Sequence, residues 1–181
     1  MTPATLGIVA PHPPIMVPEV GGARSEVTAD STKALEYAAS LLERFDPDAV
    51  VIMSPHAPVT RTAFIVDESE RLAGDLGAFG AHRVRFNAAG DPALARAIIA
   101  EAAADDIQVL SRFESPLLEA GTLDHGVMVP LSFLDREGRY PIVVLSLSYL
   151  PLSVHHALGR AIARAATGLG RRVAFLARGD C

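Results

Sequence analysis

The chain has 181 residues, of which 50% are hydrophobic and 20% are charged, and its formal net charge is -5 at pH 7. This length and composition predict one globular domain, and the acidic balance gives no electrostatic footprint for nucleic acid. No apolar run approaches the ~20 residues that span a bilayer, the N-terminus lacks the pattern of a signal peptide, and the single cysteine, Cys181, cannot form an internal disulfide, so the sequence predicts a cytoplasmic protein.

Two predicted strands in the first part of the chain are each followed by a histidine between prolines. Residues 6–10 form the first strand, and the Pro-His-Pro-Pro that follows contains His12. An apolar stripe at helical spacing predicts a helix over residues 35–45. A second strand at residues 49–54 precedes Pro-His-Ala-Pro, which contains His56. These elements predict one β-α-β unit with a histidine after each strand.

The next segment carries two predicted strands and a helix. Residues 62–67 and 83–87 are the strands, joined by a loop that contains the glycine-rich residues 74–80. This loop is not a phosphate cradle, because it lacks the Gly-Lys-Ser/Thr ending of a P-loop and does not open a helix. Asp91 is predicted to cap a helix with Pro92 at its first position. The buried stripe of that helix consists of Leu94, Ala95, Ile98, Ile99 and Ala102.

The last part of the chain continues the alternation of strands and helices. Residues 142–145 are apolar without alternation, as expected for a central strand covered on both faces. An amphipathic helix over residues 154–169 and a last strand over residues 172–177 follow. The whole pattern predicts an α/β fold of three layers, α/β/α, with a mostly parallel or mixed central sheet.

His12 and His56 are the predicted metal ligands. Both follow the carboxyl end of a strand, where ligands bind in open α/β sheets, and neutral imidazole is the commonest metal-binding side chain. The two residues form no local metal motif, so a shared ion requires that their strands be neighbours. The alternative is that both are loop residues hydrogen-bonded to backbone.

His125 is the predicted catalytic residue. It follows Asp124 and precedes Gly126 and an apolar segment that predicts a short helix. A histidine beside a metal ion can donate to a developing oxyanion or move protons, and Asp124 is the residue predicted to orient it. Gly126 lets a ligand or backbone approach closely. The alternative is a turn histidine that caps a helix.

Other titratable residues have weaker patterns. Glu19 and Asp180 could each complete a metal site as a carboxylate ligand, although acids at loop ends are usually solvated or capping. His156 falls on a predicted solvent face, and His155 borders an apolar stripe, which favours a structural role. His82 follows the glycine-rich loop and has no assigned role.

Five motifs in order carry a resemblance to a known family. They are Ala10-Pro-His-Pro-Pro14, Ser54-Pro-His-Ala-Pro58, Gly74-Asp-Leu-Gly77, Leu123-Asp-His-Gly126 with Val129-Pro-Leu131, and Ala177-Arg-Gly-Asp180. In this combination the sequence resembles the LigB-type class III extradiol ring-cleavage dioxygenase superfamily. It looks most similar to the AmmeMemoRadiSam-associated branch, whose domain occurs alone or fused to AMMECR1-like domains and is related to the Memo proteins. The resemblance covers nearly the whole chain.

The resemblance implies a non-haem Fe(II) held by two histidines and a carboxylate, a catechol-type aromatic substrate and dioxygen. His12 and His56 match the two histidine ligands of the family. His125 matches a histidine that binds substrate or assists acid–base steps. The resemblance also implies a homodimer, or an association with an AMMECR1-like domain.

Two departures from the family pattern lead to further expectations. In relatives a histidine follows the Gly-Asp turn, and the carboxylate ligand lies farther downstream, so we expect residues 1–181 to be a single LigB-like domain that is truncated at its C-terminal end. Cys181 is a candidate ligand, one position early for the metal-binding cysteine of Memo-like relatives. Two other functions stay open: a Memo-like binding or regulatory protein with a degenerate metal site, and a zinc-dependent hydrolase, since a zinc-bound water reaches a pKa near ~7.

Overall fold

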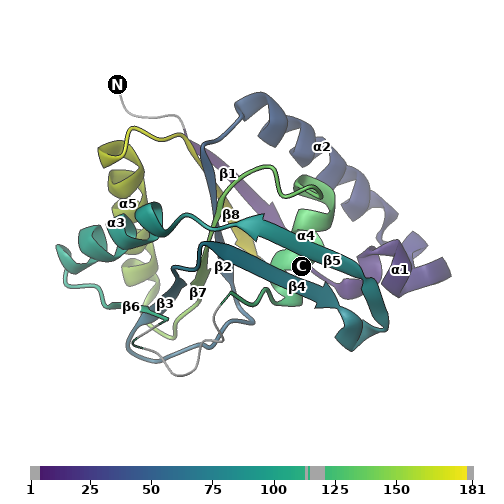
Figure 1. Cartoon of the computed structure of the whole chain (residues 1–181), viewed down its shortest axis with the longest axis horizontal. Helices are drawn as coiled ribbons and strands as arrows, with labels where there is room; N and C mark the ends of the chain where they lie inside the picture. Colours follow the sequence, from purple (N-terminus) through teal and green to yellow (C-terminus); the bar gives the residue numbers. More distant parts are fainter. Residues whose placement is uncertain (1–4, 113, 115–120, 179–181) are drawn as a thin grey trace.

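A six-stranded mixed sheet forms the centre of the fold (Figure 1). The computed structural model describes residues 5–112, 114 and 121–178. The strand order is β1-β8-β2-β7-β3-β6; the first four run parallel, whereas β3 is antiparallel to β7 and parallel to β6. The strands are β1 (Thr5–Ala10), β2 (Ala49–Ser54), β3 (Phe64–Asp67), β6 (Val109–Ser111), β7 (Ile142–Ser146) and β8 (Val173–Arg178).

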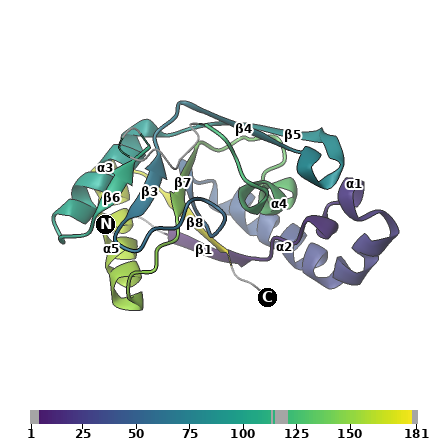
Figure 2. The same ribbon diagram turned by 90° about the horizontal axis from the view of Figure 1, so that it is seen from below.

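Helices cover both faces of this sheet (Figures 1 and 2). Alternate residues of the central strand β2 point into two separate cores, Val50 and Ile52 into one and Val51 into the other. This is the three-layer α/β/α arrangement that the alternation of strands and helices predicts. The first core is covered by α2 (Ala29–Phe45) and α4 (His125–Leu134), and the second by α3 (Pro92–Ala103) and α5 (Leu152–Gly168).

Most predicted elements are present, with some differences at their ends. The helix predicted over residues 35–45 begins earlier, at Ala29. Residues 29–34 are mostly exposed and add nothing to the apolar stripe from which the helix was predicted, so the stripe does not reveal them. The short helices η1 (Pro14–Met16), α1 (Pro18–Gly21) and η2 (Gly22–Thr28) fill the connection from β1 to α2. Among the described residues, no helix has the length and apolar character needed to cross a bilayer.

The glycine-rich segment is not the loop that the sequence predicts. Residues 71–76 form β4 (Arg71–Leu76), which pairs antiparallel with β5 (Ala81–Ala89) through the turn η3 (Gly77–Phe79). Leu72 and Leu76 are buried against the core beside α4, while the residues between them are more exposed. Gly74 permits this contact, because a Cβ there would lie 2.7 Å from the carbonyl oxygen of Leu123. The glycine therefore marks close packing of a strand.

Asp91 caps α3 as predicted. Its carboxylate accepts a hydrogen bond from the backbone N–H of Leu94 at 3.0 Å, and Pro92 occupies the first turn. Asp91 is buried and forms an ion pair with Arg171. The charge of the cap is therefore compensated inside the fold.

Candidate metal centre

Three histidines from distant parts of the chain meet at one edge of the sheet. His12 follows β1, His56 follows β2, and His125 is the first residue of α4. One ligand atom of each imidazole lies within 4.8 Å of those of the other two, so the cluster could hold a metal ion. The ring centroids are 5.0 Å apart for His12 and His56, 4.0 Å for His56 and His125, and 6.1 Å for His12 and His125.

The sheet topology brings His12 and His56 together. The expectation that their strands are neighbours is wrong, because β8 lies between β1 and β2. Both strands pair in parallel with β8, so all three end at the same edge. His12 is buried, with 8% of its surface exposed, and His56 is exposed. Ser54 at the end of β2 is fully buried, and its hydroxyl accepts the backbone N–H of His56 at 3.2 Å. His12 therefore lies on the side of the cluster that faces the protein interior, and His56 on the side that faces solvent.

Asp124 holds the first turn of α4, on which His125 lies. Its carboxylate accepts hydrogen bonds from the backbone N–H groups of Gly126 at 2.6 Å and Val127 at 3.2 Å. Ser54 Oγ donates to the same carboxylate at 2.7 Å. These contacts tie the start of α4 to the end of β2, so Asp124 places the backbone of His125 relative to His56.

Arg178 lies behind this network, and the sequence reasoning did not single it out. It is the last residue of β8, and its side chain is fully buried. Nη1 donates to Ser54 Oγ at 3.1 Å and lies 3.7 Å from Asp124 Oδ1. A Cβ at residue 126 would overlap the guanidinium, so Gly126 admits a side chain where we predicted a ligand or backbone. The signal that could have pointed to Arg178 is its charge at the end of an otherwise apolar strand.

The pKa of His125 is lowered from the ordinary value of 6.5. Partial burial is the main cause, followed by the positive charge of His56; Arg178 acts in the same direction, and the carboxylate of Asp124 opposes it. The lowered pKa favours the neutral form of His125 at neutral pH. Only a neutral imidazole can bind a metal ion or accept a proton.

Other predicted residues lie apart from the cluster. Glu19 is an exposed residue of α1 whose carboxylate lies 3.5 Å from the guanidinium of Arg136. His155 Nδ1 is 3.2 Å from the carbonyl oxygen of Pro151, and its ring packs edge-on against Phe64, which agrees with a structural role. His82 and His156 are exposed. Asp180 and Cys181 lie outside the described residues.

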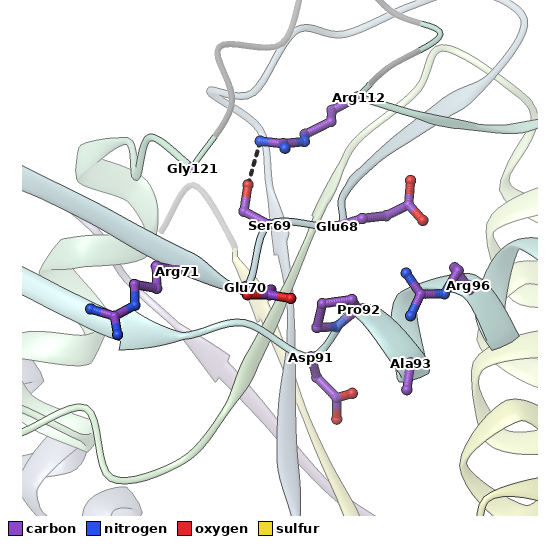
Figure 3. Close-up of a pocket in the computed structure, with 10 residues that line it drawn as sticks. All are labelled: Glu68, Ser69, Glu70, Arg71, Asp91, Pro92, Ala93, Arg96, Arg112 and Gly121. Carbon is purple, nitrogen blue, oxygen red and sulfur yellow. Dashed lines mark hydrogen bonds between the residues drawn. The ribbon is translucent and has the colours of Figure 1, made fainter.

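A charged cavity of about 760 Å³ lies elsewhere, where β4 and α3 begin (Figure 3). Three acids and three arginines line it, and the three clustered histidines do not: the charged residues are Glu68, Glu70, Arg71, Asp91, Arg96 and Arg112. Arg112 donates to Ser69 Oγ at 2.6 Å, and Ser69 Oγ in turn donates to Asp67. Arg112, Ser69 and Asp67 thereby join neighbouring loops, and we assign the cavity no function.

The chain matches one protein family over nearly its whole length. The model of the catalytic LigB subunit of aromatic ring-opening dioxygenase matches residues 6–181. The chain belongs to this family. The resemblance predicted from the five motifs is therefore confirmed at the level of the LigB family, and the narrower placement in the Memo-related branch stays a prediction.

Two relatives of this LigB-family chain are longer than the part that it matches. Protein CA_C1420 of Clostridium acetobutylicum is 28% identical over 174 residues, which are 94% of this chain and 37% of that protein. The crystal structure of the uncharacterized protein JW3007 from Escherichia coli K12 matches with a TM-score of 0.59 and 27% identity, covering 82% of this chain and 52% of that one. The chain thus spans about half or less of these relatives.

Proposed function

We propose that this LigB-family chain belongs to an extradiol ring-cleavage dioxygenase, which opens a catechol-type aromatic ring with dioxygen. The observation that supports the proposal most directly is the convergence of His12, His56 and His125 at the carboxyl edge of the sheet. This edge is where open α/β folds bind their ligands. The family of the chain supports the reaction class.

The donor set fits a transition-metal ion, and Fe(II) is our first choice, with zinc second. Imidazole suits both metals. Imidazole nitrogens lie about 2.0–2.1 Å from a bound zinc ion, so ligand atoms within 4.8 Å of one another need only small side-chain rotations to share an ion. Bound Fe(II) supplies redox chemistry that lets dioxygen react with an aromatic diol.

We assign different roles to the three histidines. His12 and His56 hold the ion, the first from the protein side and the second from the solvent side. His125 accepts a proton from a substrate hydroxyl, a role that its lowered pKa favours because the ring is neutral at neutral pH. Asp124 acts as a positioning residue, since its hydrogen bonds place the turn that carries His125.

Metal content and oxygen uptake test these roles separately. The protein and its His12→Ala, His56→Ala and His125→Ala variants are loaded anaerobically with Fe(II), and bound iron is measured before oxygen and a panel of catechols are added. We expect the first two variants to lose iron and the third to keep iron but lose oxygen uptake. Stoichiometric iron in the wild type without uptake for any catechol would contradict the dioxygenase proposal.

A zinc-dependent hydrolase is the second candidate, favoured by one specific observation. Within the described residues, the group that could hold a metal consists of three histidines and contains no carboxylate, and three histidines form one of the ligand sets of catalytic zinc. Zinc in the protein as purified, together with ester hydrolysis that is indifferent to oxygen, would favour this candidate over the dioxygenase.

A further inference from the structure

The tip of the β4–β5 hairpin brings an aromatic side chain to the metal centre. Phe79 is the last residue of η3, and its ring centroid lies 5.0 Å from that of His125 with the two planes at 63°. Phe79 is 39% exposed. It therefore touches the histidine cluster on one side and leaves part of its ring open to solvent.

The position of Phe79 is fixed by the turn around it. Asp75 accepts the backbone N–H of Gly77 at 2.7 Å, and the N–H of Gly80 donates to the carbonyl oxygen of Gly77 at 2.9 Å. Gly80 has φ +83°, a conformation that glycine adopts without strain. Buried Leu76 and Ala81 anchor the two sides of the turn in the core.

The β4–β5 hairpin and α4, the helix that carries His125, pack against each other in the core. Leu72 and Leu76 of β4 belong to the same buried cluster as Met128 of α4. At Gly74 the hairpin approaches Leu123 and the sulfur of Met128 so closely that a Cβ would lie 2.7 and 2.8 Å from them. Because α4 also begins with His125, the ring of Phe79 keeps its place beside that residue.

We propose that Phe79 is a specificity-determining residue, which forms an apolar wall of the substrate site and contacts the ring of an aromatic ligand bound at the histidine cluster. The inference rests on the proposed function and adds a residue from outside the motifs that carry the histidines. Aromatic rings attract one another in edge-to-face and offset-stacked arrangements at centroid distances of about 4.5–7 Å. The rings of Phe79 and His125 themselves lie within this range, so a ligand ring that packs against His125 on this side would contact Phe79.

The test compares two chelating ligands on the zinc-loaded protein, which avoids any need for turnover. 4-Nitrocatechol carries a ring and is followed by its visible spectrum; oxalate is a bidentate ligand without a ring and is followed by competition. We expect Phe79→Ala to weaken 4-nitrocatechol about tenfold, which corresponds to ~1.4 kcal/mol, and to leave oxalate and zinc affinity unchanged. Phe79→Tyr should restore most of the 4-nitrocatechol affinity, because it restores the ring.

Tyr37→Ala serves as the matched control, because Tyr37 is another exposed aromatic residue, 65% exposed and within α2. It should change neither ligand. If Phe79→Ala weakens both ligands equally, or neither, the inference is wrong while the metal site stands. If the zinc-loaded wild type binds oxalate but not 4-nitrocatechol, the proposed aromatic substrate and the inference both fail. Absence of zinc binding in the wild type would overturn the metal site itself.

Discussion

At the scale of single residues, the fold changes the protonation of His125. Burial and the charges of His56 and Arg178 lower its pKa below 6.5, against the opposing carboxylate of Asp124. The unfolded chain has an ordinary histidine, which binds a proton near pH 6.5. The folded protein therefore binds fewer protons than the unfolded chain as pH falls through 6.5 toward the folded pKa.

This difference predicts an acid sensitivity with a defined sign. Above the unfolded pKa both states hold His125 neutral and it contributes nothing; as pH falls below that value, the folded state loses free energy of unfolding. We expect the metal-free wild type to lose more stability than His125→Gln between about pH 7.5 and about pH 5.5, measured by urea unfolding. Equal losses in the two proteins would show that this histidine titrates normally.

Gly126 is the residue whose side chain the site cannot accept. Gly126→Ala would push a methyl group into the buried guanidinium of Arg178, and overpacking of this kind costs about 1–3 kcal/mol. We expect a lower unfolding free energy by that amount and weaker zinc binding, because the turn that carries His125 would shift.

Gly159→Ala is a matched control for that change. Gly159 lies within α5, and a Cβ there meets nothing within 4 Å. Because alanine favours a helix interior over glycine by roughly 0.5–1 kcal/mol, this variant should be slightly more stable. A Gly126→Ala protein with unchanged stability and metal affinity would mean that Arg178 can move away at no cost.

At the scale of elements, the start of α3 depends on Asp91. Removal of an N-cap costs about 0.5–2 kcal/mol, and Asp91→Ala also leaves Arg171 without its buried carboxylate. We expect thermal unfolding to show a loss at the upper end of this range. Asp91→Asn, which keeps the capping oxygen but not the charge, should lose less, and Asp30→Ala in the exposed first turn of α2 should change little.

The sequence correctly predicts the elements that local patterns determine. It does not predict a strand that depends on contacts with distant residues. The stripe of α3 and the apolar run of β7 are visible in short windows of sequence, and both elements are present. The sequence predicts a loop there because Gly74 and the glycines that follow it, Gly77 and Gly80, are typical of loops. Residues 71–76 form a strand because they pair with β5, and they pack against α4; neither contact can be read from the segment itself.

At the scale of the whole molecule, a bound ion would join three separate parts of the chain. His12 lies in the loop after β1, His56 lies in the loop after β2, and His125 begins α4. An ion that binds only the folded state stabilises it by about 2.7 kcal/mol when its free concentration is 100 times the dissociation constant. We expect zinc to raise the midpoint of thermal unfolding and a chelator to reverse the rise. In His56→Ala the shift should shrink or vanish; an undiminished shift would place the ion elsewhere.

The sequence by itself determined the three-layer fold class and identified the three candidate histidines. Both follow from strand and helix periodicity and from the order of the motifs, which are properties of neighbouring residues. Only the tertiary structure decided that those histidines share one cluster, that Arg178 lies buried against Ser54 and Asp124, and that Phe79 reaches His125. Each of these contacts joins residues that are distant in the chain. Strand order and helix packing bring such residues together, and no local pattern records either.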